Sequence, residues 1–348
     1  MTYQPKQKAA VVTIFCGLTY QASAELIWSD EFDSNGAPDA TVWSYDLGAG
    51  GWGNSELQEY TSDSSNVRVD NGVLLIQARE VRTRGKRTKY TSARIKTEDK
   101  LTIKYGTIEA RIQMPDIADG LWPAFWTLGN NFSSVGWPAC GELDIVEMGS
   151  SGAIQDGVVR RRISSTAHWE HSGSHASYGL AYDADVDLNN DFHIYRMDWT
   201  PDTVTTYIDG NWVWTMDISP DSCTDCTEFH EPHFLILNLA VGGTFPGLFR
   251  TSDITAPTPA TYAVDYLRIY ANEFSQLGGS SIDGGGGDDG GGGDDGGGDD
   301  VDADGDGYTV AEGDCNDADA TINPGARDRG GKKWADGIDN DCNNIVDG

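Results

Sequence analysis

The sequence predicts an all-β protein, a sandwich or barrel of short strands, followed along the chain by an acidic tail. Between residue 25 and about residue 272, short apolar stretches alternate with turns rich in Gly, Asn, Asp and Pro, and no convincing helical pattern separates them. Aromatic residues are numerous, with 11 Trp, 14 Tyr and 10 Phe in 348 residues. The clearest strands are expected at residues 73–76, 106–112, 192–197 and 264–270.

The formal charge is −31, and about half of it sits in the last fifth of the chain. From residue 283 to residue 348 there are 19 acidic and 4 basic residues, a net charge of −15. A chain this acidic repels nucleic acid, so we expect no nucleic-acid partner. The acidic block points instead to cation binding in the tail.

The N-terminal residues have the pattern of a secretory signal peptide. Lys6 and Lys8 form a short basic region, residues 9–17 are almost entirely apolar, and residues 22–24 read Ala-Ser-Ala, a typical cleavage site. The apolar run is too short to span a bilayer. We therefore expect residues 1–24 to be removed and the protein to be secreted, with no membrane partner. An anchored or cytosolic N-terminus is the alternative.

Five cysteines would remain after cleavage, and export permits disulfides. Cys223 and Cys226 could close a small loop, while Cys315 and Cys342 bracket the acidic module and could close it. Cys140 would then be left over, and we expect it to be a buried thiol.

Three segments follow the signal peptide. Residues 25–272 hold the strand pattern and are expected to form one domain. Residues 273–300 contain Gly blocks broken by Asp-Asp pairs, which cannot bury a core, so we expect a flexible linker there. Residues 301–348 are expected to form a separate small module.

The most informative segment is 141–147, which reads Gly-Glu-Leu-Asp-Ile-Val-Glu. It places Glu142, Asp144 and Glu147 in an apolar run with the pattern of a buried strand. Burying a carboxylate costs several kcal/mol unless it is paired or functional. Three together on one short strand suggest acid–base and nucleophilic chemistry. A surface or ion-paired acidic strand is the alternative.

The spacing of these carboxylates makes a structural prediction. In a regular strand alternate residues share a face, so Glu142 and Asp144 would lie together and Glu147 would face away. A β-bulge at Ile145 and Val146 would return Glu147 to the face of Glu142. The two Glu could then flank a scissile bond, one ionised as nucleophile and one protonated as acid, with Asp144 separating their pKa values.

Together with other segments, these carboxylates make residues 25–272 resemble glycoside hydrolase family 16, and within it the laminarinase-type β-1,3-glucanases. The family's E-x-D-x-x-E signature is matched by Glu142, Asp144 and Glu147. The other matching segments, in chain order, lie at residues 28–32, 51–61, 90–94, 105–111, 121–128, 168–169 and 265–268.

The resemblance implies a β-jelly roll of two curved antiparallel sheets with an open cleft on the concave side. It implies endo-acting hydrolysis of a β-1,3-glucan with retention of the anomeric configuration, and no cofactor in catalysis. Glu142 is then the nucleophile, Glu147 the acid/base and Asp144 the assisting carboxylate. The expected partner is the polysaccharide, and the expected state is a monomer.

Several residues are expected to bind the sugar chain. Sugar rings expose apolar C–H faces that stack on flat aromatic side chains, so Trp near the carboxylates are candidates, with core packing as the alternative. The candidates are Trp122, Trp126 and Trp137 for stacking, Asn54 and Arg94 for hydrogen bonding by resemblance to the family, and His168 at the leaving-group side. Trp52 is a further candidate for the border of the cleft, and a structural role is the alternative for His168.

The family often carries a structural calcium on the convex side, remote from catalysis. Asp265, in a run that is otherwise apolar and aromatic, is the matching carboxylate. Backbone carbonyls near Glu31 and Gly72 are the expected co-ligands. A salt bridge of Asp265, for instance with Arg268, is the alternative.

The acidic module carries Asp302, Asp304 and Asp306 at alternate positions, as in loops that bind hard cations. Position 313 is Gly where an EF-hand needs Glu, so the loop is not a standard EF-hand. The module resembles thrombospondin type 3-like calcium-binding repeats of secreted bacterial proteins. This implies a calcium-bound appendage that could attach the protein to the cell surface, with a disordered acidic tail as the alternative.

Other functions stay open. Mixed-linkage β-1,3-1,4-glucanase, agarase, carrageenase and transglycosylase activities are alternatives within catalysis. A non-catalytic β-glucan-binding protein on the same fold is disfavoured, because such proteins typically lose catalytic carboxylates and all three are present here.

Overall fold

The computed structural model describes residues 25–82 and 89–283 of the chain. The predicted signal peptide, residues 284–300 of the predicted linker and the module at 301–348 lie outside the described residues. The predictions on Asp302, Asp304, Asp306, Cys315 and Cys342 therefore stay predictions.

Ten strands form one sheet, and their order across the sheet differs from their order in the chain. Their order is β16 (Asn211–Asp217), β15 (Thr203–Ile208), β14 (His193–Trp199), β9 (Gly106–Gln113), β18 (Ala260–Tyr270), β5 (Val73–Val81), β6 (Lys89–Ser92) and β3 (Gln58–Tyr60), with β1 (Leu26–Asp30) on β18 and β4 (Val67–Asp70) on β5.

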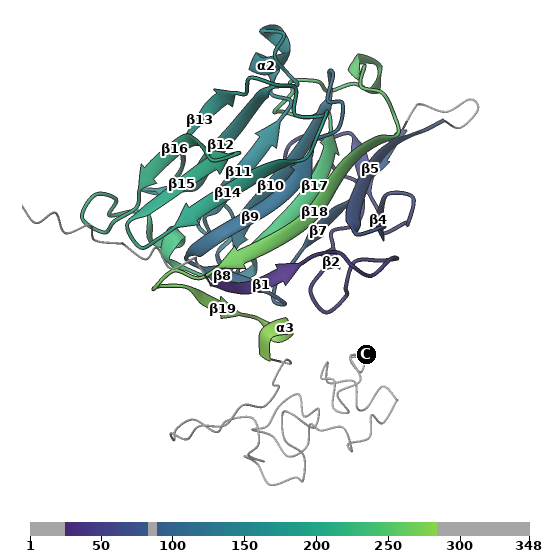
Figure 1. Cartoon of the computed structure of the whole chain (residues 1–348). Coiled ribbons are helices and arrows are strands. Elements are labelled where there is room, and N and C mark those ends of the chain that lie inside the picture. The colour runs from purple at the N-terminus through teal and green to yellow at the C-terminus, as the bar shows by residue number, and fades with distance from the viewer. Residues whose placement is uncertain (1–24, 83–88, 284–348) are drawn as a thin grey trace, which may run out of the picture. The chain divides into compact units, whose positions relative to one another are not determined.

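Nine strands form the second sheet, and the two sheets lie one over the other (Figure 1). Their order is β13 (Ser174–Asp183), β12 (Arg162–His171), β11 (Glu142–Met148), β10 (Leu121–Gly129), β17 (His233–Val241), β7 (Arg94–Lys96) and β2 (Ser44–Tyr45), with β8 (Thr102–Lys104) on β17 and β19 (Gln276–Gly278) on β8. Strand pairs in the described residues are antiparallel apart from the parallel pair β3 and β6.

The hydrophobic core lies between the sheets. In β9 and β14 every second side chain is buried, among them Ile108, Ile112, Tyr195 and Met197. All nine residues of β17 are buried: Leu235, Leu237 and Leu239 lie in the core between the sheets, whereas Phe234 and Ile236 pack with Leu128 and Cys140 in a second, smaller cluster.

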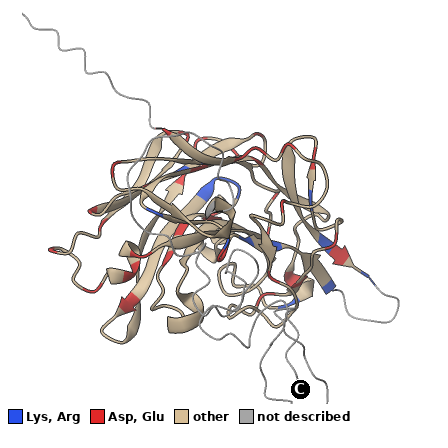
Figure 2. Ribbon diagram, turned by 90° about the horizontal axis from the view of Figure 1, so that it is seen from below, with Lys and Arg blue, Asp and Glu red and all other residues tan. Residues whose placement is uncertain are grey.

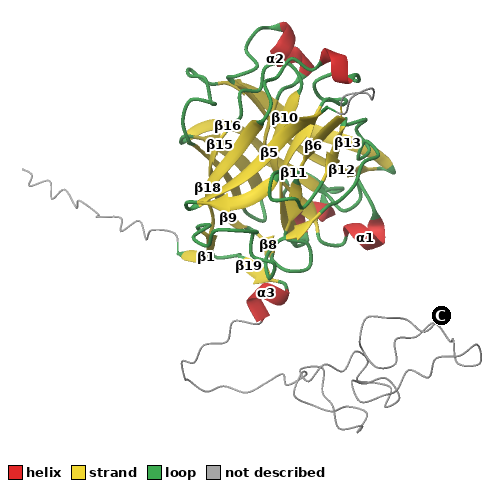
Figure 3. Ribbon diagram, turned by 90° about the vertical axis from the view of Figure 1, so that its right-hand side faces the viewer, coloured by secondary structure: helices red, strands yellow, loops and turns green. Residues whose placement is uncertain are grey.

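Short helices lie at the margins of the strands (Figure 3). They are α1 (Phe132–Val135), α2 (Ser151–Gln155), η1 (Thr227–His230), η2 (Thr251–Asp253) and α3 (Ser280–Asp283). In the part of the chain that the structure describes, no helix has both the length and the apolar character needed to cross a bilayer. The predicted all-β sandwich of β-jelly-roll type is confirmed.

The predicted end of the β domain at residue 272 is too early. Strand β19 pairs with β8 through Gln276, Leu277 and Gly278, and α3 follows it to Asp283. Leu277 packs against the core as well. The first residues of the predicted linker therefore belong to the folded domain, because they complete an edge of the second sheet.

Charged residues are spread over the loops and strand ends of this domain, with acidic and basic positions interspersed (Figure 2). Arg162 pairs with Asp183 at 2.6 Å and Arg160 with Asp116 at 2.7 Å, for example. Such exposed pairs contribute ~0–1 kcal/mol each to stability. The fold is held by its apolar core.

Candidate active site

The predicted β-bulge is present in β11. In the pairing with β10, Val146 and Asp144 face consecutive residues, so Ile145 is the extra residue. The pairing with β12 shifts in the same place, between Asp144 and Glu147. Ile145 and Val146 both lie in the hydrophobic core. The bulge therefore returns Glu147 to the face that carries Glu142 and Asp144.

The three carboxylates lie in a cleft of about 780 Å³ on the face of the second sheet that is turned away from the core. The residues predicted to bind sugar, together with Trp52, all line this cleft: Asn54, Arg94, Trp122, Trp126, Trp137 and His168. None of the three predicted stacking Trp is fully buried, and Trp126 also packs against the small cluster that contains Leu128 and Phe234. Segments far apart in the sequence meet here because β7, β10, β11 and β12 share one sheet.

Glu142 is contacted from two sides. Trp137 donates a hydrogen bond from Nε1 to Oε2 of Glu142 at 2.8 Å, and Nε2 of His168 lies 3.9 Å from Oε1. Burial raises the pKa of Glu142 to about 8 and the charge of Asp144 adds to the rise, whereas His168 and the Trp137 hydrogen bond oppose it. Neutralising Asp144 would therefore favour the ionised form of Glu142.

Asp144 lies between the two Glu and is 4% exposed. Its Oδ2 lies 3.1 Å from Nε2 of His168, within hydrogen-bond distance. Ser165 donates a 2.7 Å hydrogen bond from Oγ to the backbone carbonyl of Asp144 and so fixes the strand at this point. Burial raises the pKa of Asp144 to about 7, so this carboxyl can hold a proton near neutral pH.

Glu147 contacts the opposite wall of aromatic residues. Trp122 donates a hydrogen bond from Nε1 to Oε1 of Glu147 at 2.9 Å, and its ring stacks on Phe245 with centroids 5.0 Å apart. Burial raises the pKa of Glu147 well above its ordinary value, and the charge of Asp144 adds to the rise. This shift favours the protonated form of Glu147, the form that a general acid needs.

Burial makes simultaneous ionisation of all three carboxyls expensive. The cleft can thus present one ionised carboxylate and one protonated carboxyl side by side, which is the requirement for acid-assisted nucleophilic substitution. The alternative of an acidic strand at the surface is wrong. Asp144 and Glu147 are buried, and no Lys or Arg in the described residues forms a salt bridge with either of them.

Glu142, Asp144 and His168 also bring potential metal-ligand atoms within 4.8 Å of one another. The close approach of His168 to the two carboxylates as a hydrogen-bonding partner accounts for this grouping. We assign no metal to it.

Arg94 is held between two indole rings in the cleft wall. The centre of its guanidinium lies 4.7 Å from the ring centre of Trp126 and 5.5 Å from that of Trp52. Its Nε lies 2.9 Å from Oδ2 of Asp46. Two cation–π contacts and an ion pair hold the guanidinium in place, and its remaining N–H groups are available to sugar hydroxyls.

A chain of hydrogen bonds fixes Trp126 from behind. Trp126 donates from Nε1 to Oδ1 of Asn238 at 2.7 Å, and Asn238 donates from Nδ2 to the hydroxyl of Tyr60 at 3.3 Å. The Tyr60 hydroxyl donates to Oε2 of Glu56 at 3.1 Å. The orientation of the Trp126 ring is therefore set by residues of two other segments of the chain, β17 and residues 51–61.

Among the cleft residues that sequence reasoning missed, four take part in the contacts described here: Glu56, His175, Asn238 and Phe245. Glu56 lies inside the segment 51–61 that carries the family resemblance, so a signal for it existed. Asn238 interrupts the apolar run from Phe234 to Val241, which was a weaker signal. No pattern marked His175 or Phe245, because only the pairing of the strands and loops brings them to the cleft.

The predicted calcium ligands lie in salt bridges. Asp265 accepts a 2.6 Å hydrogen bond from Nη1 of Arg111, and Glu31 accepts two 2.8 Å hydrogen bonds from Arg268. The salt-bridge alternative for Asp265 is therefore present, with Arg111 as the partner. Gly72 lies in the turn between β4 and β5 and offers its backbone carbonyl alone. Calcium binding by these residues stays a prediction, and the Asp265 carboxylate that it would use is paired with Arg111.

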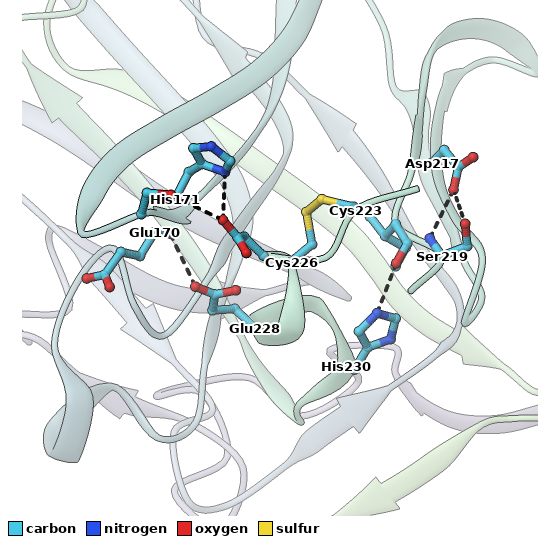
Figure 4. The surroundings of a disulfide bond; sticks show 11 residues. Glu170, His171, Asp217, Ser219, Cys223, Cys226, Glu228 and His230 are labelled. Atoms are coloured by element: carbon cyan, nitrogen blue, oxygen red, sulfur yellow. Dashed lines mark hydrogen bonds and ion pairs between the residues drawn. A yellow bond between two sulfur atoms is a disulfide. The ribbon is translucent and has the colours of Figure 1, made fainter. Parts of the chain in front are cut away.

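The cysteine predictions hold for the described residues. Cys223 and Cys226 form a disulfide in the loop before η1 (Figure 4). Cys140 is a buried free thiol, and burial raises its pKa to about 12. An inert structural role for Cys140 follows from this.

The loop after the disulfide packs against the start of the carboxylate strand. Glu228 accepts a 3.2 Å hydrogen bond on Oε1 from the backbone N–H of Glu170 (Figure 4). Gly141 has a φ of +77°, and a Cβ at this position would come 2.7 Å from Cβ of Glu228. Only glycine suits this position, which immediately precedes Glu142.

An all-β sandwich with buried carboxylates and Trp side chains in one cleft defines a carboxylate-dependent glycoside hydrolase. Comparison with known families supports this class directly. Residues 54–267 match the profile described as Glycosyl hydrolases family 16. The chain belongs to this family.

Relatives and solved structures agree. The chain is 36% identical to a β-glucanase of Rhodothermus marinus over 254 residues, 71% of this chain and 85% of the relative. It covers 38% of the length of two longer relatives. The laminarinase catalytic domain of Thermotoga maritima is 39% identical, with a TM-score of 0.60 and coverage of 72% and 98% of the two chains. A Bacteroides ovatus mixed-linkage glucan GH16 protein in complex with a G4G4G3G product is 31% identical, with a TM-score of 0.62 and coverage of 70% and 100%.

Proposed function

We propose that this protein is a secreted endo-β-1,3-glucanase that cleaves laminarin-type glucan with retention of the anomeric configuration. The observation that carries the proposal is the bulge in β11, which gathers Glu142, Asp144 and Glu147 on the floor of a cleft lined with Trp. The similarity to a laminarinase catalytic domain supports the β-1,3 linkage. We expect a monomer that requires no cofactor for catalysis.

In the proposed mechanism, the carboxylate of Glu142 attacks the anomeric carbon and forms a glycosyl–enzyme ester. The glycosidic C–O bond breaks, and the leaving oxygen takes the proton of Glu147. Ionised Glu147 then removes a proton from water, which attacks the same carbon and releases Glu142. Two inversions give net retention.

The contacts of each carboxyl support these roles. The hydrogen bond from Trp137 and the proximity of His168 favour an ionised Glu142, as a nucleophile requires. The raised pKa of Glu147 keeps a proton available for the leaving group. Asp144 can take a proton when both Glu are ionised, or give up its charge to favour ionisation of Glu142.

The test is reducing-sugar release from laminarin, lichenan, agarose and carrageenan by the wild type and by Glu142→Gln. We expect laminarin to be the best substrate and the variant to lose turnover, because an amide is a poor nucleophile. Inactivity of the folded wild type on all four polysaccharides would contradict the proposal and favour a glucan-binding protein. Activity of Glu142→Gln near the wild-type level would contradict the assignment of the nucleophile.

A mixed-linkage β-1,3-1,4-glucanase is the second candidate. The similarity to the Bacteroides ovatus protein with a bound G4G4G3G product favours it. The ratio of kcat/KM on lichenan to that on laminarin separates the two: a value above one favours the mixed-linkage enzyme.

Secretion and calcium binding belong to the proposal on sequence grounds. N-terminal sequencing of the exported protein is expected to begin at Glu25, and an intact Met1 would contradict export through the predicted signal. For calcium, we expect titration of the full chain to detect binding through the acidic module. A site at Asp265 would need Arg111 to release the carboxylate, so Asp265→Asn would have to abolish a measurable part of that binding.

A further inference from the structure

One histidine of the cleft has no part in the mechanism above. His175 lies on β13, next to β12, and its ring stacks on His168 with centroids 5.1 Å apart and planes at 22°. The indole of Trp137 lies 4.6 Å from the ring of His175 and 6.2 Å from that of His168. Trp137 also donates the hydrogen bond to Glu142, so these rings pack beside the nucleophile.

The same rings form a hydrogen-bonded line to a catalytic carboxylate. Nε2 of His175 lies 2.9 Å from Nδ1 of His168. Nε2 of His168 lies 3.1 Å from Oδ2 of Asp144. Three side chains on three neighbouring strands, β13, β12 and β11, thus connect the edge of the second sheet to the centre of the site.

The chemistry of imidazole decides where the hydrogens lie along this line. Ionised Asp144 can only accept, so His168 must carry its hydrogen on Nε2. A neutral imidazole has one N–H, so Nδ1 of His168 is then a bare acceptor that needs a donor. In the described residues, Nε2 of His175 is the group placed to donate to it.

We propose that His175 is a positioning residue, which fixes the ring and tautomer of His168 so that Nε2–H of His168 points at Asp144. The inference rests on the proposed function, to which it adds a residue outside the reacting groups. Without this donor, His168 can rotate or change tautomer, and Asp144 loses a hydrogen bond to its ionised form. The protonation of Glu142 and Glu147 depends in turn on the charge of Asp144.

The surroundings of His175 allow this role over a wide pH range. The titratable groups that face it are His168, whose Nδ1 lies 2.9 Å away, and Glu170, its pairing partner, both on β12, and beyond His168 the carboxyls of Glu142 and Asp144 on β11. Burial and the neighbouring His168 lower the pKa of His175, which favours a neutral ring. Protonation of His175 at lower pH leaves a hydrogen on Nε2, so the donor is retained there as well.

Two substitutions separate hydrogen bonding from ring packing. His175→Gln keeps an N–H donor near the position of Nε2 and loses the ring, whereas His175→Phe keeps a flat ring and loses the donor. In the pH profile of kcat/KM on laminarin, His175→Phe is expected to move the acidic limb to lower pH by up to about one unit, because Asp144 loses a hydrogen bond to its ionised form and a neutral Asp144 favours ionised Glu142. His175→Gln is expected to keep the wild-type limb.

The matched control is His171→Phe in the same hairpin, where His171 pairs with Asp225 at 3.1 Å and lies outside the cleft. Its profile is expected to match the wild type. An unchanged limb in His175→Phe, or an equal shift in both variants at His175, would overturn the proposal. A shift in His175→Gln alone would assign the effect to ring packing and overturn it too.

Imidazole ¹⁵N NMR gives a readout that does not depend on activity. The signals of His168, assigned with a His168→Gln variant, are expected to show the Nε2–H tautomer in the wild type and in His175→Gln, and a tautomer mixture in His175→Phe. An unchanged tautomer in His175→Phe would contradict the inference while wild-type activity on laminarin still upholds the proposed function. Lack of wild-type activity would contradict the proposed function and leave the tautomer result to be judged separately.

Discussion

Trp137 donates a 2.8 Å hydrogen bond from its indole nitrogen to the carboxylate of Glu142. The indole is 47% exposed, so its edge contacts the proposed nucleophile while part of its surface stays available to a sugar ring. Trp122 makes the equivalent contact to Glu147 from the other side of the cleft. Each proposed catalytic Glu therefore has its own tryptophan donor, which links substrate stacking to carboxyl protonation.

Replacing Trp137 by Phe should affect the acidic limb of the pH profile. The ring is retained, but Glu142 loses a donor to its ionised form, so its pKa rises. The acidic limb of kcat/KM on laminarin should move to higher pH by about one unit. Trp212→Phe is the matched control, because Trp212 is exposed and donates to Thr215 away from the cleft. An unmoved limb in Trp137→Phe would show that the hydrogen bond does not control Glu142.

Replacing Trp122 by Phe should affect the opposite limb. The hydrogen bond from Trp122 favours ionised Glu147, so its loss raises the pKa of the proposed acid further. Activity that disappears when Glu147 loses its proton would then persist to higher pH. We expect the alkaline limb of the same profile to move upward by about one unit, with the Phe ring still able to stack on Phe245. A downward move would contradict the role of Glu147 as the acid.

Substituting the acid should matter less when the leaving group needs no proton. Glu147→Gln is expected to lower kcat on laminarin by ~10²–10⁴, the usual contribution of a general acid. On an aryl β-glycoside of laminaribiose with an acidic phenol, the glycosylation step should be nearly normal and should show as a burst of phenol. Equal losses on both substrates would indicate that Glu147 does not protonate the leaving oxygen.

Neutralising Asp144 should stabilise the protein at alkaline pH. Burial raises the pKa of this carboxyl to about 7, above its value in the unfolded chain. Its favourable contribution is therefore fully present below about pH 4 and is lost as the pH rises through about 7. At pH 8, Asp144→Asn should have a higher melting temperature than the wild type, and its free energy of unfolding should be greater by on the order of a few kcal/mol. At pH 4, the two proteins should be equally stable. An advantage of the same size at both pH values would point to packing instead of charge.

Gly141→Ala tests the contact between the disulfide loop and the carboxylate strand. Both Gly141 and Gly173 have positive φ, but a Cβ at Gly141 meets Glu228 whereas one at Gly173 meets nothing within 4 Å. Gly173→Ala should thus show the cost of backbone strain alone, about 1 kcal/mol. Gly141→Ala should cost about 1–3 kcal/mol more in chemical denaturation and should lower kcat, because Glu142 is the next residue. Equal losses in the two variants would mean that the loop does not constrain Glu142.

Local patterns in the chain were sufficient for much of this site. The alternation of side chains in a strand is set by the backbone, so the spacing of Glu142, Asp144 and Glu147 was enough to predict a bulge. The family resemblance implied the open cleft, the Trp near the carboxylates were expected to line it, and the short apolar strands between turns predicted a β sandwich. Each of these inferences depends on residues close together in sequence.

Partners across strands and between loops required the tertiary structure. Nothing local shows that His175 meets His168, that Arg111 instead of Arg268 pairs with Asp265, or that β19 extends the sheet beyond residue 272. Such contacts depend on strand order and register, which are set by the summed packing of both sheets and not by any one segment. The three carboxylates therefore lie in one short strand and could be predicted from its sequence. The side chains that influence their protonation come from other strands and loops, and only the tertiary structure brings them into contact.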